Sequence, residues 1–250
     1  MMKKIALIIS LTWILSLGSV NDADTLPPVD LIHIPTAGVL QKQQFHFQLF
    51  TYANGGMLFS TRIGIIKPLT LGFAYGGESI IGERKINWNQ RVEFSLKIRI
   101  LEEKINRPAF CLGYDSQGLG PFVKSLSRYQ LKSKGFFAAV SKNYKVYGNL
   151  GIHGGLNYSL EDKNDRNLNF FAGADKDILK NLFAKLEYDF AFNDNNKASL
   201  GRGRGYMHLG LDYQIAPEIQ IEFILLDILK NREGAYDPVR TFRINYYTGF

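Results

Sequence analysis

The residues in this sequence whose side chains could bind ligands or take part in reactions are charged residues and histidines. They alternate with large apolar residues. Glu93, Lys97 and Arg99 show the pattern most clearly, since apolar residues stand between them. Side chains alternate between two faces along a β-strand, so one face of this segment is charged and the other is apolar. A charged face this regular is typical of the wet interior of a barrel whose other face meets lipid.

Applied to the whole chain, this pattern predicts a set of lumen-facing residues that are candidates for transport. Two interpretations of their mixed charge stay open. One is a conduit for a polar chain, in which the basic residues favour acidic sugars. The other is a lattice of salt bridges that plugs a structural or partner-binding barrel without flux. The candidates are Arg62, Glu93, Lys97, Arg99, Asp115, His153, Lys185, Glu187, Asp189, His208, Asp212, Glu222 and Arg243.

Catalysis is a weaker interpretation of the same residues. His46, His153 and His208 fall on the predicted lumen face, but no serine stands in a recognisable nucleophile context. We therefore predict no enzyme, with a barrel hydrolase on lipid or sugar as a third alternative. No spacing of His, Asp or Glu suggests a metal, no cofactor is expected, and the single cysteine, Cys111, excludes an intrachain disulfide.

Composition agrees with β structure at a membrane. Of the 250 residues, 46% are hydrophobic and 13% aromatic, and the mean hydropathy of -0.11 is too polar for a bundle of membrane helices. The formal charge of +7 is spread along the chain. Without a basic run interleaved with aromatic residues, no nucleic-acid partner is expected.

The chain start predicts export. A cationic Met1–Lys4, an apolar run to Leu17 and small residues after it have the order of a secretory signal peptide, which we place at residues 1–20. Residues 21–42 contain three prolines and are predicted to form an extended periplasmic lead-in. Residues 43–250 are predicted to form an all-β, antiparallel up-and-down transmembrane barrel of about 12 strands.

The strands of this barrel are predicted from alternation and from the turn residues between the alternating segments. An even strand number places both chain ends on one side, the periplasm, and long connections on the other. The predicted strands are 43–52, 57–66, 70–77, 92–100, 109–115, 129–141 with a bulge near residue 135, 146–159, 167–175, 182–193, 206–214, 219–226 and 241–250.

The last predicted strand resembles the terminal signal of bacterial outer-membrane barrels. Its apolar face carries Phe242, Ile244, Tyr246 and Phe250. These residues predict assembly in the outer membrane of a Gram-negative cell. The expected partners are outer-membrane lipid and the periplasmic and outer-membrane barrel-assembly machinery.

Several blocks of the chain resemble the YjbH-like outer-membrane proteins. The blocks are Ile98–Phe122, Arg128–Gly135 with Ser141 and Lys142, Leu150–Gly155, and Ile34–Leu40 in the lead-in. In that family the proteins are associated with exopolysaccharide production or export. The resemblance therefore implies a porin-like barrel with polysaccharide as a partner. This chain would be a single short barrel unit, because the usual members are much larger.

Overall fold

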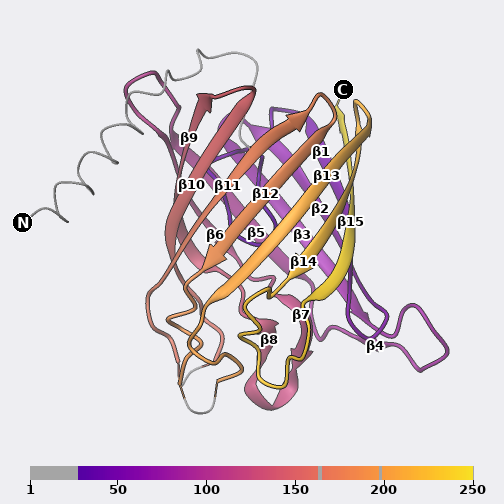
Figure 1. Ribbon diagram of the computed structural model, residues 1–250. Coiled ribbons are helices and arrows are strands. Elements are labelled where there is room, and N and C mark those ends of the chain that lie inside the picture. Colours follow the sequence, from indigo (N-terminus) through magenta and orange to yellow (C-terminus); the bar gives the residue numbers. More distant parts are fainter. Residues whose placement is uncertain (1–27, 163–164, 197–198, 250) are drawn as a thin grey trace, which may run out of the picture.

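A computed structural model describes residues 28–162, 165–196 and 199–249, and these form a β-barrel of obliquely running strands (Figure 1). The predicted signal peptide and Phe250 lie outside the described residues. The twelve wall strands are β1 (Gln44–Tyr52), β2 (Gly56–Ile66), β3 (Leu69–Glu78), β5 (Glu93–Leu101), β6 (Ala109–Asp115), β9 (Gly135–Lys145), β10 (Asn149–Tyr158), β11 (Asn169–Leu179), β12 (Leu182–Asp189), β13 (Tyr206–Ala216), β14 (Ile219–Leu226) and β15 (Val239–Gly249).

The sheet is closed and antiparallel, as predicted. Each wall strand pairs with its neighbours in chain order, and β1 pairs with β15 to complete the ring. Closure pairs the backbone groups that an open edge would leave exposed, which a lipid environment requires. The Asn54-Gly55 turn between β1 and β2 has positive φ at both residues, as a tight hairpin demands.

One predicted strand is wrong. Residues 129–141 do not form a single bulged wall strand, because the chain turns at Gly135, where φ is +61°. An added Cβ at Gly135 would lie 2.2 Å from the carbonyl oxygen of Tyr158, so this close approach favours glycine. Before the turn, β8 (Arg128–Leu131) pairs with β7 (Leu119–Val123) in a separate small sheet.

The remaining elements are small, and the ends of several predicted strands move. A short strand, β4 (Asn87–Trp88), extends the edge of β3, and a 3-10 turn, η1 (Lys124–Leu126), links β7 to β8. The strand predicted for 182–193 ends at Asp189, and the one predicted for 167–175 continues to Leu179. No helix within the described ranges has the length and apolar character to cross a membrane.

The outer surface of the wall is a band of exposed apolar side chains. Phe73 is 55% exposed, Phe94 52% and Phe223 64%, and each belongs to the face opposite the charged residues. Soluble proteins rarely expose a continuous apolar surface of this extent, whereas a membrane barrel presents one to lipid. The apolar face of the alternation therefore points outward, as the sequence predicts.

The two ends of the barrel differ in their connections. We call the end where β1 begins and β15 finishes the turn end, because the other connections there are short. The opposite end is the loop end, where four of the connections run over residues 79–92, 116–134, 190–205 and 227–238. In Figure 1 the loop end is at the bottom, together with β7 and β8. This alternation of short and long connections is the one predicted.

Candidate functional site: a plugged lumen

The lumen contains part of the chain itself. Residues 28–41, which we call the plug, lie inside the barrel, and Leu31, Ile34 and Ala37 have no exposed surface. The extended periplasmic lead-in predicted for this segment is thereby corrected for the described residues. The physical reason is that the segment carries apolar side chains, which water would not stabilise in an extended conformation.

The tip of the plug wraps around a wall carboxylate. Backbone N–H groups of Ile32, His33 and Ile34 all donate to the Glu187 carboxylate on β12, at 2.9–3.0 Å. Successive N–H groups converging on one anion form a nest, and bonds to a charged acceptor are stronger than neutral ones. Glu187 is 1% exposed, so these donors replace the water that it loses.

Cations on the wall bind the other polar groups of the plug. Arg243 on β15 donates to the carbonyl oxygens of Leu31 and Ile32, at 2.8 and 2.9 Å. Asp30 of the plug forms ion pairs with Arg62 at 2.6 Å and Lys97 at 3.2 Å. The predicted lumen cations therefore have fixed internal partners.

The second half of the plug is held by neutral contacts. The N–H of Leu40 donates to Thr70 on β3 at 2.9 Å. The Cys111 thiol on β6 donates to the carbonyl oxygen of Thr36 at 3.3 Å, and Cys111 is fully buried. Leu31, Ile34 and Ala37 pack against Cys111, Phe137 and Phe171 in a buried apolar cluster.

A serine, a histidine and an aspartate form a hydrogen-bonded chain on the wall beside the plug. His153 Nδ1 lies 2.7 Å from Ser141 Oγ, and His153 Nε2 lies 2.6 Å from Asp175 Oδ1. Ser141 Oγ also accepts the N–H of Ala37 at 2.8 Å, and Ser141 is 1% exposed. These residue types recur in hydrolases, but here the plug covers the hydroxyl, so the chain links the plug to the wall.

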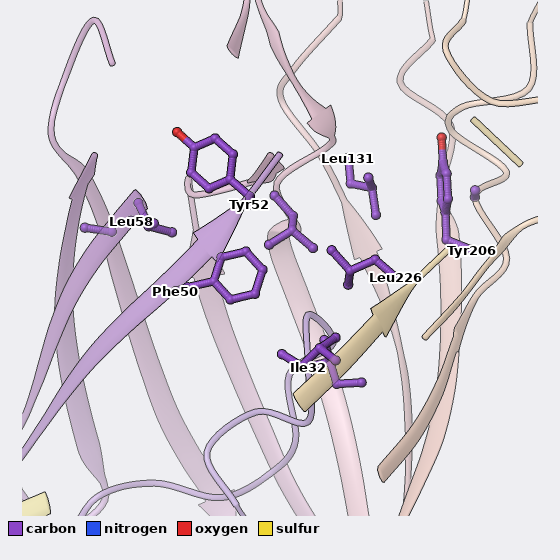
Figure 2. Close-up of a cluster of buried hydrophobic side chains, with 11 residues drawn as sticks. Ile32, Phe50, Tyr52, Leu58, Leu131, Tyr206 and Leu226 are labelled. Carbon is purple, nitrogen blue, oxygen red and sulfur yellow. The ribbon is translucent and has the colours of Figure 1, made fainter. Parts of the chain in front are cut away.

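The loop end of the lumen is filled by an apolar core. Figure 2 shows Ile32 of the plug near Phe50 and Leu226 of the wall, with Leu131 of β8 above them. Tyr52, Leu58 and Tyr206 belong to the same buried cluster. We call this core, with the β7–β8 hairpin and the loops around it, the cap. It closes the loop end by apolar packing.

Ion pairs reinforce the cap. Arg128 of β8 has no exposed surface; its guanidinium binds both carboxylate oxygens of Asp194 and donates to the carbonyl oxygens of Tyr129 and Gln130. Tyr206 donates to the same carboxylate at 2.7 Å. Buried charges with so many partners fix the position of the hairpin over the barrel.

Glu161, in the loop after β10, is a buried carboxyl group of the cap. Its carboxylate accepts the N–H groups of Tyr129 and Ser133, each at 3.2 Å. Burial raises the pKa of Glu161 to about 7, although these bonds and the charge of Arg128 act in the opposite direction. Its proton uptake therefore falls in the physiological range.

At the turn end the lumen contains a cavity, whereas at the loop end it is filled by the apolar core. A cavity of about 440 Å³ lies between the plug and the ends of the wall strands. Most of its lining residues have polar side chains, among them Gln44, Gln48, Asn245 and Tyr247, and Leu40 of the plug is part of its inner boundary. We call this cavity the vestibule. A smaller cavity of about 60 Å³ lies deeper, next to His33.

The predicted lumen residues all lie on the inner side of the wall. Arg62, Lys97, His153, Glu187 and Arg243 gather around the plug through the contacts described above. The other positions are distributed as follows: Lys185, Asp212 and Glu222 in one ion-paired group; Glu93 and Asp189 with the cap residues Tyr129 and Lys134; His208 beside Glu187; Arg99 near Glu102; and Asp115 at the smaller cavity.

The predicted assembly residues Phe242, Ile244 and Tyr246 lie on the outer face, and the fourth, Phe250, lies outside the described residues. Phe242 and Tyr246 are 39% and 42% exposed, and Ile244 lies between them on the same side of β15. In the described part of the chain, no group of three or more His, Cys, Asp or Glu side chains could hold a metal ion.

The sequence interpretation missed the plug and its contacts with Ser141 and Thr70. One signal could have found it: Val29, Leu31 and Ile34 are apolar residues in a short segment that shows no strand alternation. A segment of that kind needs a buried surface. Inside a barrel with a polar wall, such a buried surface exists only beside apolar inner residues such as Phe137 and Phe171.

Together, the closed antiparallel sheet, the apolar outer band and the charged interior define a transmembrane β-barrel of the outer-membrane type. No family model and no curated protein match the sequence. The chain is similar in structure to a KdgM porin, with a TM-score of 0.48, 7% identity and coverage of 83% of this chain and 99% of the porin.

Two further solved structures are similar to a comparable degree. A NanC porin has a TM-score of 0.43 at 12% identity, with 82% of this chain and 99% of that chain covered. Outer membrane phospholipase A from Escherichia coli has a TM-score of 0.42 at 11% identity, with 94% and 95% covered. At these scores and identities, the similarities carry no argument about what this chain binds.

Proposed function

We propose that this protein is an outer-membrane barrel associated with polar saccharide chains, and that its lumen is a gated pathway. Both chain ends of the barrel would face the periplasm, and the long loops of the loop end would face outside. The resemblance to YjbH-like proteins supports the saccharide association. The observation that carries the proposal is the vestibule, a polar cavity inside the lumen whose inner boundary is a separate segment of the same chain.

The geometry favours a gate over a fixed pore. The plug is attached to the wall by hydrogen bonds, ion pairs and side-chain packing, and it forms no wall strand. Contacts of this kind can be exchanged when the plug moves toward the turn end. In the arrangement described here, however, the plug and the cap both fill the lumen, so no steady flux is expected.

Conductance in planar bilayers tests the gate. Asp30→Lys places a cation against Arg62 and Lys97, and like charges at these distances repel inside the lumen. Wild-type protein should remain closed, and Asp30→Lys should show openings. Asp237→Lys is the matched control, because the Asp237 side chain is 79% exposed in a loop. A wild-type protein that conducts steadily would contradict the gate.

Native Cys111 reports the position of the plug in the same samples. It is buried against Thr36, so a water-soluble maleimide should label it only after the plug moves. If Asp30→Lys exposes Cys111 without conductance, the cap alone keeps the lumen closed. That result would favour the second candidate, a structural or partner-binding barrel without transport, which the filled loop end supports.

A barrel hydrolase is the third candidate, and the Ser141–His153–Asp175 chain is the observation in its favour. The Ser141 hydroxyl is covered by Ala37 in this structure, so attack on a substrate would need prior movement of the plug. Hydrolysis of a soluble ester by Asp30→Lys that disappears on adding Ser141→Ala would support this candidate. Equal rates in the two proteins would exclude a role for this serine.

A further inference from the structure

The lining of the vestibule contains uncharged polar side chains in addition to its ion-paired residues. Its lining contains the side-chain amides of Gln44, Gln48, Gln220 and Asn245, and the aromatic ring of Tyr247. At about 440 Å³ it falls within the range of pockets that hold small ligands, roughly 300–1,000 Å³. The plug contacts described above lie on the inner side of this cavity, and they do not account for the polar groups on the rest of its lining.

The cations of the vestibule are already neutralised. The lining cations are Arg62, Lys185 and Arg243, which are bound to Asp30, to Asp212 and to Glu222 respectively. Because these ion pairs are short and Lys185 and Arg243 are buried, neither cation is available to a new anion without breaking an internal pair.

Two lining carboxylates have no lysine or arginine as their closest partner. Asp175 binds His153 at 2.6 Å, and Asp177 accepts from the side chain of Asn149 at 2.7 Å. The cavity lining thus holds one more carboxylate than it holds cations. The carboxylates are Asp30, Asp175, Asp177 and Asp212, and the cations are Arg62, Lys185 and Arg243. An acidic chain would meet this surplus of negative charge without a free cation to offset it.

The neutral part of the lining suits hydroxyl groups and a flat C–H surface. An amide carries both a donor and an acceptor, as each hydroxyl of a ligand does. Gln48 donates to Asn245 at 3.2 Å and accepts from Ser60 at 3.2 Å, so the amide of Gln220 and the NH2 group of Asn245 are the groups that face a ligand. The Tyr247 ring stacks on His46, with centroids 4.3 Å apart and an interplanar angle of 7°, and this stacking fixes its orientation. His46 is only 3% exposed, whereas Tyr247 is partly exposed and is the accessible member of the pair. A ring held in this way can pack against the apolar face of a ligand while its hydroxyl bonds to it.

From these contacts we propose that the vestibule binds an uncharged, hydroxyl-rich ligand, namely a neutral oligosaccharide segment, and discriminates against acidic sugars. This inference deepens the proposed function and rests on its saccharide association. It reverses the preference for acidic sugars predicted from sequence. Tyr247 would supply the packing surface, and the amide of Gln220 and the NH2 group of Asn245 would supply the hydrogen bonds.

Calorimetry on the full chain in detergent micelles tests the site with two probes, maltohexaose and an oligogalacturonate of similar length. Maltohexaose should bind with a Kd in the millimolar range or below, roughly the affinity of a few such contacts, and the acidic probe should bind at least tenfold more weakly at low salt. Tyr247→Ala should weaken maltohexaose binding about tenfold. Tyr236→Ala is the control, because Tyr236 is 88% exposed in a loop at the other end.

A second variant keeps the test decisive if Tyr247→Ala fails to fold, which the loss of heat-dependent mobility on gels would reveal. Gln220→Ala removes only one lining amide and should weaken maltohexaose binding severalfold. Equal or tighter binding of the acidic probe, or no maltohexaose binding at about 10 mM, would overturn the inference. The outcome is separable from the gate: maltohexaose binding together with an Asp30→Lys variant that shows no openings retains the site and rejects the conduit, and openings of Asp30→Lys without maltohexaose binding do the reverse.

Discussion

The two ends of the lumen are built from the same wall strands but are filled in different ways. At the loop end, an apolar cluster and the buried Arg128–Asp194 ion pair close the barrel. At the turn end, the wall residues face a cavity of about 440 Å³ lined by amides and ion pairs. The difference indicates that the loop end provides closure, whereas the turn end has the space and chemistry for a ligand. The plug lies between them and contacts both.

The largest effect is expected where a buried charge of the cap loses its partner. Arg128→Ala leaves Asp194 and two carbonyl groups without their donor in a fully buried position, which should cost the cap about 3–5 kcal/mol. Hydrogen exchange of the β8 amides should accelerate by several hundredfold. The wall should stay folded, as judged by its heat-dependent mobility on gels.

Arg84→Ala is the matched control for this substitution, because Arg84 is exposed in the loop after β3. Its exchange rates should equal those of the wild type. If Arg128→Ala leaves β8 protected, then the cap is held by its apolar cluster alone, and the contrast between the ends is one of packing without an ionic contribution.

The cap should also respond to pH. The pKa of Glu161 is raised by burial to about 7 in the folded state, from 4.5 in the unfolded chain. The folded cap thus binds the proton more tightly, so its stability is greatest below the unfolded value and falls as pH rises through about 7. The protection factors of the Tyr129 and Ser133 amides should fall by up to about a hundredfold between pH 5 and pH 8, equivalent to nearly 3 kcal/mol.

Glu161→Gln should remove most of this pH dependence, because glutamine keeps an acceptor for the two amides but does not ionise. Glu83→Gln, in an exposed loop, should leave the pH profile unchanged. A pH profile that is the same in Glu161→Gln and in the wild type would assign the effect to another group.

The alternation of residues sufficed to predict the wall, because it reflects local geometry that each strand carries in its own sequence. The plug could not be predicted in this way. Its partner Glu187 is more than 150 residues away in the chain, and the nest is formed by backbone N–H groups, which have no sequence signature. The division of 129–141 into β8 and β9 was missed for a related reason. Alternation tells which face a side chain is on, but it does not tell which sheet the strand joins.

At the plug itself, a moderate effect is expected from Glu187→Gln. The amide retains one acceptor for the N–H groups of Ile32, His33 and Ile34 but loses the charge that strengthens all three bonds, at a cost of about 2 kcal/mol. Maleimide labelling of Cys111 should become roughly thirtyfold faster if labelling follows plug opening. Unchanged labelling would show that the apolar contacts of Leu31 and Ile34 suffice to hold the plug.

The smallest effect concerns the link between the vestibule and the plug. Ser141→Ala removes the acceptor of the Ala37 N–H and the partner of His153, whose other nitrogen binds the vestibule residue Asp175. The loss should be about 1 kcal/mol, so Cys111 should be labelled about fivefold faster. Ser199→Ala is the matched control, since its buried hydroxyl donates to Asp165 in the loops and not to the plug or the vestibule. If Ser141→Ala also changes how strongly maltohexaose slows Cys111 labelling, the ligand and the plug are coupled through this chain of hydrogen bonds. If the protection by maltohexaose is identical in Ser141→Ala and in the wild type, the vestibule and the plug act independently, and the Ser141–His153–Asp175 chain only holds the plug.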